Sequence, residues 1–147
     1  MVDSESLGFK LDSFDHIGVV VKDLDATIKS WSSLLGVGPW TGVGMSDHIV
    51  KGAMTTVGQV KVELLQPVEG GEPYPNLVGQ QTNWADFLNT HGEGLHHICA
   101  RVADVDAAVA KLVAEGGEVI VSSPGSMAYV RIGGPGSVVL ELLKTPQ

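Results

Sequence analysis

The sequence predicts an α+β fold of two tandem βαβββ modules, because two pairs of segments repeat and each half contains one amphipathic helical pattern. The stretches 16–28 and 97–109 align without a gap and share His, Ile, Val, Asp, Asp and Ala. The stretches 58–66 and 136–144 share Gly, Val, Glu, Leu and Leu. The first pair is offset by 81 residues and the second by 78, so both halves keep the same order of segments.

Each repeat opens with a β-strand that leads into an amphipathic helix. Apolar residues recur at helical spacing in DLDATIKSWSSLLG and again in DVDAAVAKLVAEGG. Asp23 and Asp104 are the predicted N-caps, and Gly36 and Gly117 are the predicted helix stops. The strand and helix therefore form the same unit twice.

Three further strands are predicted after each helix, near 40–46, 49–57 and 58–66, and near 118–122, 127–132 and 136–143. We expect a single domain over 1–147, with module 1 at about 13–67, a linker at 68–94 and module 2 at about 95–144. The front of the linker is rich in Pro and Gly and predicts a loop. Its later part, QTNWADFLNTHG, predicts a short helix that ends at Gly92.

The composition of the chain argues against several classes of binding partner. The formal net charge is −8, which argues against nucleic acid and anionic membrane surfaces. The start of the chain lacks the pattern of a signal peptide, and no run approaches the ~20 apolar residues that a membrane span needs. The lone cysteine, Cys99, cannot form an internal disulfide. We therefore expect a cytoplasmic protein that acts on a small molecule.

Four polar residues fall at matching places of the two repeats. His16 and His97 lie on the first strands, and Glu63 and Glu141 lie on the last strands, within VKVELL and VVLELL. A carboxylate in the middle of such an apolar strand needs a partner if it is buried. Two neutral imidazoles and two carboxylates would suit a divalent metal and leave the site about neutral.

Two adjacent histidines compete for the ligand position in the second repeat. Side chains alternate along a strand, so His96 and His97 must point to opposite faces. A single strand histidine is more often packed than ligating, but His97 has its counterpart in His16, whereas the counterpart of His96 is Asp15. The sequence therefore predicts that His97 is the ligand and His96 is not.

These motifs, from DHIGVVVKDLDA to VVLELLK, resemble the vicinal oxygen chelate superfamily over nearly the whole chain. That superfamily includes glyoxalase I, methylmalonyl-CoA epimerase, type I extradiol dioxygenases, and fosfomycin and bleomycin resistance proteins. The resemblance implies a curled mixed sheet around a metal, formed by the two modules, and usually a homodimer. Its ligand positions match His16, Glu63, His97 and Glu141. FLNTHGEGLHHICARVADVDAAVAKL and VELLQP are most similar to the methylmalonyl-CoA epimerase family.

The resemblance also implies an activity and a cofactor. It predicts a metal-dependent epimerase or isomerase that stabilises an enolate of a bidentate carbonyl substrate, such as an acyl-CoA. The divalent ion could be Co, Ni, Mn, Zn or Fe. At the second ligand position the bacterial epimerase pattern favours Gln, so Glu63 resembles the bacterial glyoxalase I set. The longer linker also departs from the epimerase pattern.

The predicted acid–base residues come from the same resemblance. The catalytic Glu proposed for the epimerase family, sixteen residues before the ELL Glu, falls on Asp47, a shorter carboxylate that could equally be a turn residue. Glu141 or Glu63 would supply the second group if it leaves the metal, as resemblance to glyoxalase I implies. His48 and His91 are weaker candidates.

Three further residue types have two interpretations each. Arg101 shares the face of His97 by alternation, so it could bind a substrate carboxylate or phosphate, or form a structural salt bridge. Trp40 and Trp84 could line a pocket or pack in the core. Cys99 also shares the ligand face, where it could attack a substrate or, as a small apolar residue, more simply fill space.

Three other functions stay open. An extradiol Fe(II) dioxygenase would use His16, His97 and Glu141 and leave Glu63 spare. A glyoxalase-type lyase or isomerase would act on a thiol adduct. A non-catalytic drug-binding resistance protein on the same fold would need no metal.

Overall fold

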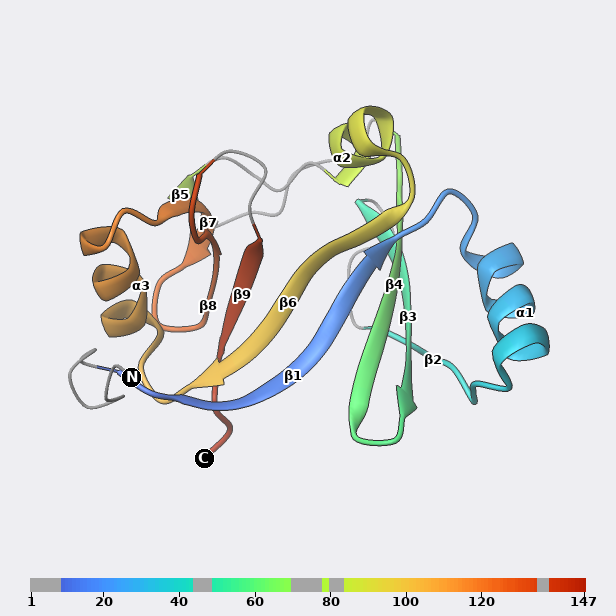
Figure 1. Ribbon diagram of the computed structural model, residues 1–147, viewed down its shortest axis with the longest axis horizontal. Helices are drawn as coiled ribbons and strands as arrows, with labels where there is room; N and C mark the ends of the chain where they lie inside the picture. The colour runs from blue at the N-terminus through green and yellow to red at the C-terminus, as the bar shows by residue number, and fades with distance from the viewer. Residues whose placement is uncertain (1–8, 44–48, 70–77, 80–83, 135–137) are drawn as a thin grey trace. The chain divides into compact units, whose positions relative to one another are not determined.

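Each half of the chain forms a strand, a helix and further strands in the computed structural model (Figure 1). The structure describes residues 9–43, 49–69, 78–79, 84–134 and 138–147. These residues belong to two compact units. The α1 unit comprises His16–Tyr74 and Asn83–His96, and the α3 unit comprises the remaining described residues.

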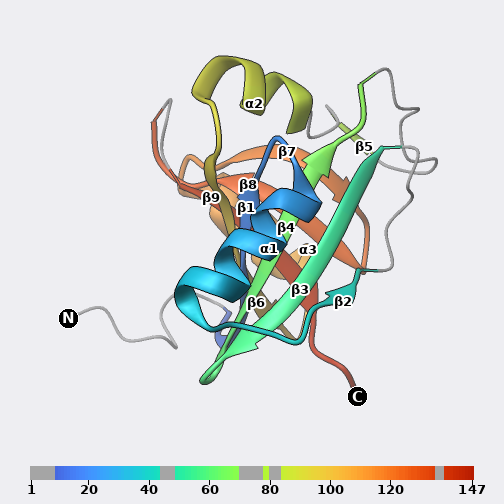
Figure 2. The ribbon, with the colours of Figure 1, turned by 90° about the vertical axis from the view of Figure 1, so that its right-hand side faces the viewer.

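The α1 unit is a mixed sheet with two helices. Its elements are β1 (Leu11–Val20, from His16 onward), α1 (Leu24–Leu35), β2 (Thr41–Gly42), β3 (Val50–Val57), β4 (Val60–Pro67) and α2 (Trp84–His91). β1 pairs with β4 in parallel, and the antiparallel pairs β4–β3 and β3–β2 extend the sheet. The long β3–β4 hairpin is plain in Figure 2.

The α3 unit repeats this arrangement. Its elements are β5 (Val78–Gly79), β6 (Gly94–Val102, from His97 onward), α3 (Val105–Ala114), β7 (Glu118–Ser123), β8 (Met127–Arg131) and β9 (Val139–Lys144). β6 pairs with β9 in parallel, and β9–β8, β8–β7 and β7–β5 are antiparallel. The predicted α+β class with two βαβββ repeats is therefore confirmed.

The helix starts agree with the sequence. Asp23 caps α1 by accepting a hydrogen bond from the Ala26 N–H at 2.9 Å, and Asp104 caps α3 by accepting one from the Ala107 N–H at 3.0 Å. α1 also ends as predicted, at Gly36, whose φ of 66° is the left-handed conformation that glycine adopts without strain.

The end of α3 differs from the prediction at Gly117. The helix ends at Ala114 with Glu115 as its C-cap. Gly117 lies two residues further on and donates a hydrogen bond to the Leu112 carbonyl at 2.8 Å. A Cβ at Gly117 would lie 2.8 Å from that same oxygen, so this position needs glycine for the close backbone approach, not as a helix stop.

The core of each unit separates the two faces of its strands. One face of the α1 unit packs under α1, through Ala53, Val62, Leu64, Leu24 and Ile28. In the α3 unit, one face packs under α3, through Ala100, Val102, Leu140, Leu142, Val105 and Ala108. Because side chains alternate, His16 and Glu63 lie on the face away from α1, and His97 and Glu141 lie on the face away from α3.

The linker contains one expected and one unexpected element. The predicted short helix is α2, which ends at His91 just before Gly92. The two-residue strand β5 was not predicted, because its pairing with β7 depends on tertiary contact and leaves no pattern in the sequence. The strand predicted near 40–46 is limited to Thr41–Gly42 among the described residues. None of the helices in the described part of the chain is long and apolar enough to cross a bilayer.

Candidate functional site

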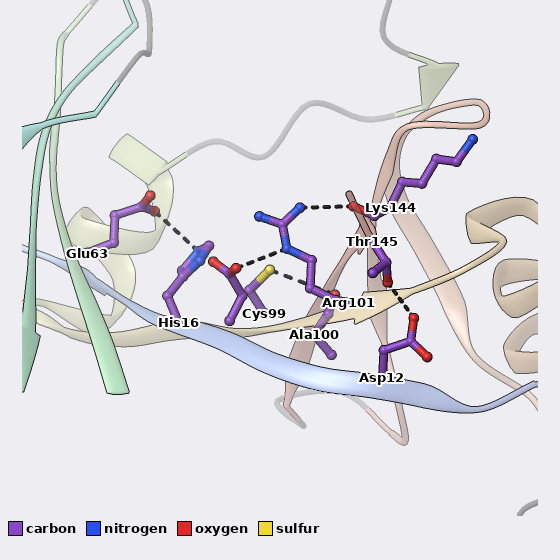
Figure 3. A network of polar contacts seen from close by, with 9 residues as sticks. Asp12, His16, Glu63, Cys99, Ala100, Arg101, Lys144 and Thr145 are labelled. Carbon is purple, nitrogen blue, oxygen red and sulfur yellow. Dashed lines mark hydrogen bonds and ion pairs between the residues drawn. The ribbon is translucent and has the colours of Figure 1, made fainter. Parts of the chain in front are cut away.

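The first module brings His16 and Glu63 together. His16 on β1 and Glu63 on β4 are 6% and 7% exposed, and His16 Nε2 lies 3.8 Å from Glu63 Oε1 (Figure 3). The parallel register of β1 and β4 sets this distance, because it pairs Gly18 with Glu63. His16 lies two residues before Gly18, so its side chain is on the same face of the sheet as Glu63. A buried carboxylate is stable here because a nitrogen donor or a cation can lie beside it.

α2 covers one end of this face. Trp84, at the start of α2, packs with Val20, Val50 and Leu65 in a buried cluster. Leu65 lies two residues beyond Glu63 on the same face of β4. The later part of the linker therefore packs close to the His16–Glu63 pair along β4.

The second module brings His97 and Glu141 closer together. His97 is 1% exposed, Glu141 is 7% exposed, and His97 Nε2 lies 3.1 Å from Glu141 Oε2. The register pairs Cys99 of β6 and Tyr129 of β8 with Glu141 on its two sides. The Tyr129 ring meets the His97 ring edge to face, with centroids 5.1 Å apart.

Cys99 fills space beside Glu141, as predicted. It is fully buried, and burial raises the pKa of its thiol far above the ordinary range. The negative charges of Glu141 and Asp15 and a hydrogen bond to Glu141 raise this pKa further, although Arg101 opposes them. Burial and the neighbouring charges therefore favour the protonated thiol over the reactive thiolate.

The donor set of each unit fits a divalent cation. Each pair consists of a buried imidazole and a buried carboxylate, which supply one nitrogen and one oxygen donor. Both side chains lie on the strand face opposite the one that packs against α1 or α3. Such nitrogen and oxygen donors suit Zn and the other divalent transition metals. A buried carboxylate in the middle of a strand is costly without a positive partner, which a dication would supply.

Arg101 is held by two contacts within the α3 unit. Its Nε donates to Asp15 Oδ2 at 2.9 Å. Its Nη1 donates to the Lys144 carbonyl at 3.0 Å (Figure 3). The salt-bridge interpretation of Arg101 is thus realised. A guanidinium has five N–H groups, so these two bonds leave three further donors.

Of the four remaining candidate residues, the structure describes two. His96 packs edge to face on Phe87, with ring centroids 5.0 Å apart, and belongs to the α1 unit. His91 is exposed and stacks on Phe87 at 4.9 Å. Asp47 and His48 lie outside the described residues.

Both tryptophans with an open interpretation pack against other side chains. Trp40 packs against Trp31 with centroids 6.3 Å apart, and its Nε1 donates to Ser32 Oγ at 3.0 Å. Trp84 is 6% exposed, and its Nε1 has no hydrogen-bond partner among the described residues.

Two residues near the candidate site are not predicted from the sequence. In the repeat, Asp15 stands out only as the counterpart of His96, yet its carboxylate binds Arg101. Tyr129 contacts His97 from a strand that the repeats do not single out. Alternation in MAYVR puts Tyr129 opposite its neighbours Ala128 and Val130, which was the available signal, but only the β8–β9 register places it beside Glu141.

A comparison with models of protein families shows which family the chain belongs to. Residues 15–133 match the model of the glyoxalase/bleomycin resistance protein/dioxygenase superfamily. The chain belongs to this superfamily. The resemblance that the motifs indicated is therefore confirmed.

Similar members of the superfamily are epimerases. The chain is 31% identical over 129 residues to an ethylmalonyl-CoA/methylmalonyl-CoA epimerase of Cereibacter sphaeroides, covering 87% of this chain and 85% of that protein. It is 29% identical over 105 residues to human mitochondrial methylmalonyl-CoA epimerase, covering 71% of this chain. The chain spans about half the length of that human relative (54%).

A solved structure of this kind shares the fold. A variant of Streptomyces coelicolor methylmalonyl-CoA epimerase in complex with 2-nitronate-propionyl-CoA has a TM-score of 0.71 and 26% identity, covering 94% of this chain and 100% of that one.

Proposed function

We propose that this chain is a metal-dependent epimerase of a malonyl-type thioester. The observation that carries the proposal is the repeated buried His–Glu pair, once per module, at corresponding places of two parallel strand pairs. The similarity to methylmalonyl-CoA and ethylmalonyl-CoA epimerases supports the choice of substrate class.

The proposed metal ligands are His16, Glu63, His97 and Glu141. Two neutral imidazoles and two carboxylates balance the charge of a dication, whether Co, Ni, Mn, Zn or Fe. A bound dication would supply Lewis acidity toward a carbonyl oxygen of the substrate. The chain's own residues must then hold the substrate and move its α-proton.

Asp47 and Glu141 are the proposed acid–base residues. Epimerisation removes the α-proton on one face of the carbon and returns a proton on the other face, so it needs two groups. One carboxylate takes the proton as the C–H bond breaks, and the other, in its acid form, donates a proton to the opposite face. Cys99 does not suit the role of the base, because burial raises the pKa of its thiol and favours the protonated form.

Arg101 is the proposed substrate-binding residue. Its bonds to Asp15 and to the Lys144 carbonyl fix the plane of the guanidinium. A fixed guanidinium with donors to spare suits a carboxylate or a phosphate. We propose that these donors bind an anionic group of the acyl-CoA.

The test is deuterium exchange at the α-carbon. Protein loaded with Co²⁺ is mixed with methylmalonyl-CoA in D₂O, and deuterium entering the α-position is followed by NMR. We expect exchange well above the spontaneous rate for the wild type and loss of that exchange in Glu141→Ala. Glu118→Ala is the matched control, since the Glu118 side chain is 72% exposed in the same unit.

Other outcomes of the exchange and metal-binding measurements would favour other functions. Metal bound at one ion per chain without exchange would reject this substrate and favour a glyoxalase-type ketone. Bound iron with O₂ uptake on a catechol would favour the dioxygenase. Failure to bind any of the five metals would favour a drug-binding protein. A homodimer and a cytoplasmic location stay predictions, and light scattering tests the first.

A further inference from the structure

Tyr129 lies against one of the proposed metal ligands. Its ring and the His97 imidazole are nearly perpendicular, at 84°, with centroids 5.1 Å apart. Aromatic rings favour this edge-to-face geometry at separations of roughly 4.5–7 Å. Tyr129 is 5% exposed and His97 is 1% exposed, so neither ring has room to turn without moving its neighbour.

The same tyrosine is fixed beside the second ligand of the α3 unit. In the antiparallel β8–β9 pair, Tyr129 lies directly opposite Glu141. Val121 and Val139 pack around Tyr129 on this face of the sheet. The backbone ladder and this packing hold the tyrosine ring, which in turn limits the orientation of the imidazole.

The first module has a methionine at the corresponding register position. The residue opposite Glu63 in the β3–β4 pair is Met54, which occupies the place that Tyr129 has opposite Glu141. Methionine is unbranched and flexible, so it defines the position of a neighbouring ring less strictly. His16 Nε2 lies 3.8 Å from its carboxylate, whereas His97 Nε2 lies 3.1 Å from its own.

We infer that Tyr129 is a positioning residue, which holds the His97 imidazole in the orientation that binds the metal. The inference rests on the proposed metal site. Residues that orient a ligating histidine typically change metal affinity about 10–100-fold when they are removed. Because ring packing carries the effect, an aromatic ring without the hydroxyl should serve as well.

The experiment compares three variants of the full chain. Tyr129→Met installs the residue found in the first module, and Tyr129→Phe keeps the ring. Val130→Ala is the control, since Val130 is the next residue, fully buried on the opposite face under α3. Co²⁺ affinity is measured by calorimetry, and the His97 ring protons are followed by NMR in the metal-free protein.

We expect Tyr129→Met to weaken Co²⁺ binding about tenfold. Tyr129→Phe should stay within about threefold of the wild type, and Val130→Ala should lose stability without losing affinity. In the NMR spectra, the His97 ring protons should show a nuclear Overhauser contact with Tyr129. Their ring-current shifts should disappear in Tyr129→Met and persist in Tyr129→Phe.

Three results would overturn the inference. The first is unchanged Co²⁺ affinity in a folded Tyr129→Met variant. The second is an equal loss in Tyr129→Phe, which would assign the effect to the hydroxyl. The third, which needs no variant to fold, is the absence of the Tyr129–His97 contact in the wild type. None of these readouts depends on substrate, so failure of the epimerase proposal would leave this test unaffected.

Discussion

The two modules keep the same His–Glu pair but surround it differently. Glu63 lies between Gly18 and Met54 in the strand registers, whereas Glu141 lies between Cys99 and Tyr129. The nitrogen–oxygen distance is 3.8 Å in the first pair and 3.1 Å in the second. The repeat therefore preserves the donors, while the residues beside each pair and the distance within it differ.

The largest expected effect tests whether the two units share one unfolding transition. Leu64 and Leu142 are fully buried next to Glu63 and Glu141, one in each unit. Leu64→Ala and Leu142→Ala should each lower the free energy of unfolding by about 3 kcal/mol, through lost transfer energy and a cavity. Urea denaturation measures this change. If each variant shifted only the unfolding transition of its own unit, the two units would unfold separately. A single free energy of unfolding would then not describe the chain.

The second prediction concerns the two carboxylates. Glu141→Gln should weaken Co²⁺ binding about 100-fold, or about 2.7 kcal/mol, and Glu63→Gln about tenfold. The physical reason is that both changes remove one charge, but only Glu141 is already held close to its histidine. Calorimetry on both variants gives the order. A greater loss in Glu63→Gln would mean that the closer pair does not contribute more to the proposed metal binding.

The third prediction uses Cys99, which stands where the first module has Gly18. The native thiol keeps its proton, because burial and Glu141 raise its pKa, whereas an unfolded thiol ionises near pH 8.5. The unfolded state thus binds fewer protons at high pH, and stability falls as pH rises. Between pH 8 and pH 10 we expect the metal-free wild type to lose about 2 kcal/mol more than Cys99→Ala.

Urea titrations of both proteins at several pH values would measure this difference. Below pH 8 the two curves should run parallel, because the thiol is protonated in both the folded and the unfolded state. An equal pH dependence up to pH 10 would contradict a protonated native thiol.

The smallest effect compares the two helix caps. Asp23→Ala and Asp104→Ala should each cost about 1 kcal/mol, since each removes one hydrogen bond to a free backbone N–H. Denaturation midpoints should shift by similar amounts in the two variants. Asp23→Asn and Asp104→Asn, which keep the accepting oxygen, should recover most of the loss.

The repeats predicted the fold class, both helix starts and the four candidate ligands. Periodicity and capping act over a few residues, so they can be seen in one sequence, as for Asp23 and Asp104. The parity of each strand also placed each Glu correctly on the face away from its helix. The ligand role itself stays a prediction.

Long-range contacts could not be predicted in this way. The ion pair of Asp15 with Arg101 joins residues far apart in the chain, and neither residue has a repeat partner that would have marked it. Tyr129 reaches His97 only through the order and register of β8, β9 and β6. Strand β5 is two residues long, which is too short to give a pattern.

The parallel pairing of the strands that carry the His–Glu pairs also constrains how each unit folds. Antiparallel neighbours such as β3 and β4 are joined by a short turn, whereas β1 reaches β4, and β6 reaches β9, only after a helix and further strands. Non-local pairings of this kind form slowly. We expect each histidine to meet its glutamate late in folding, when little of the chain is still free. A metal that binds the assembled pair would then act mainly by slowing unfolding, and would extend the lifetime of the native protein more than it speeds its formation.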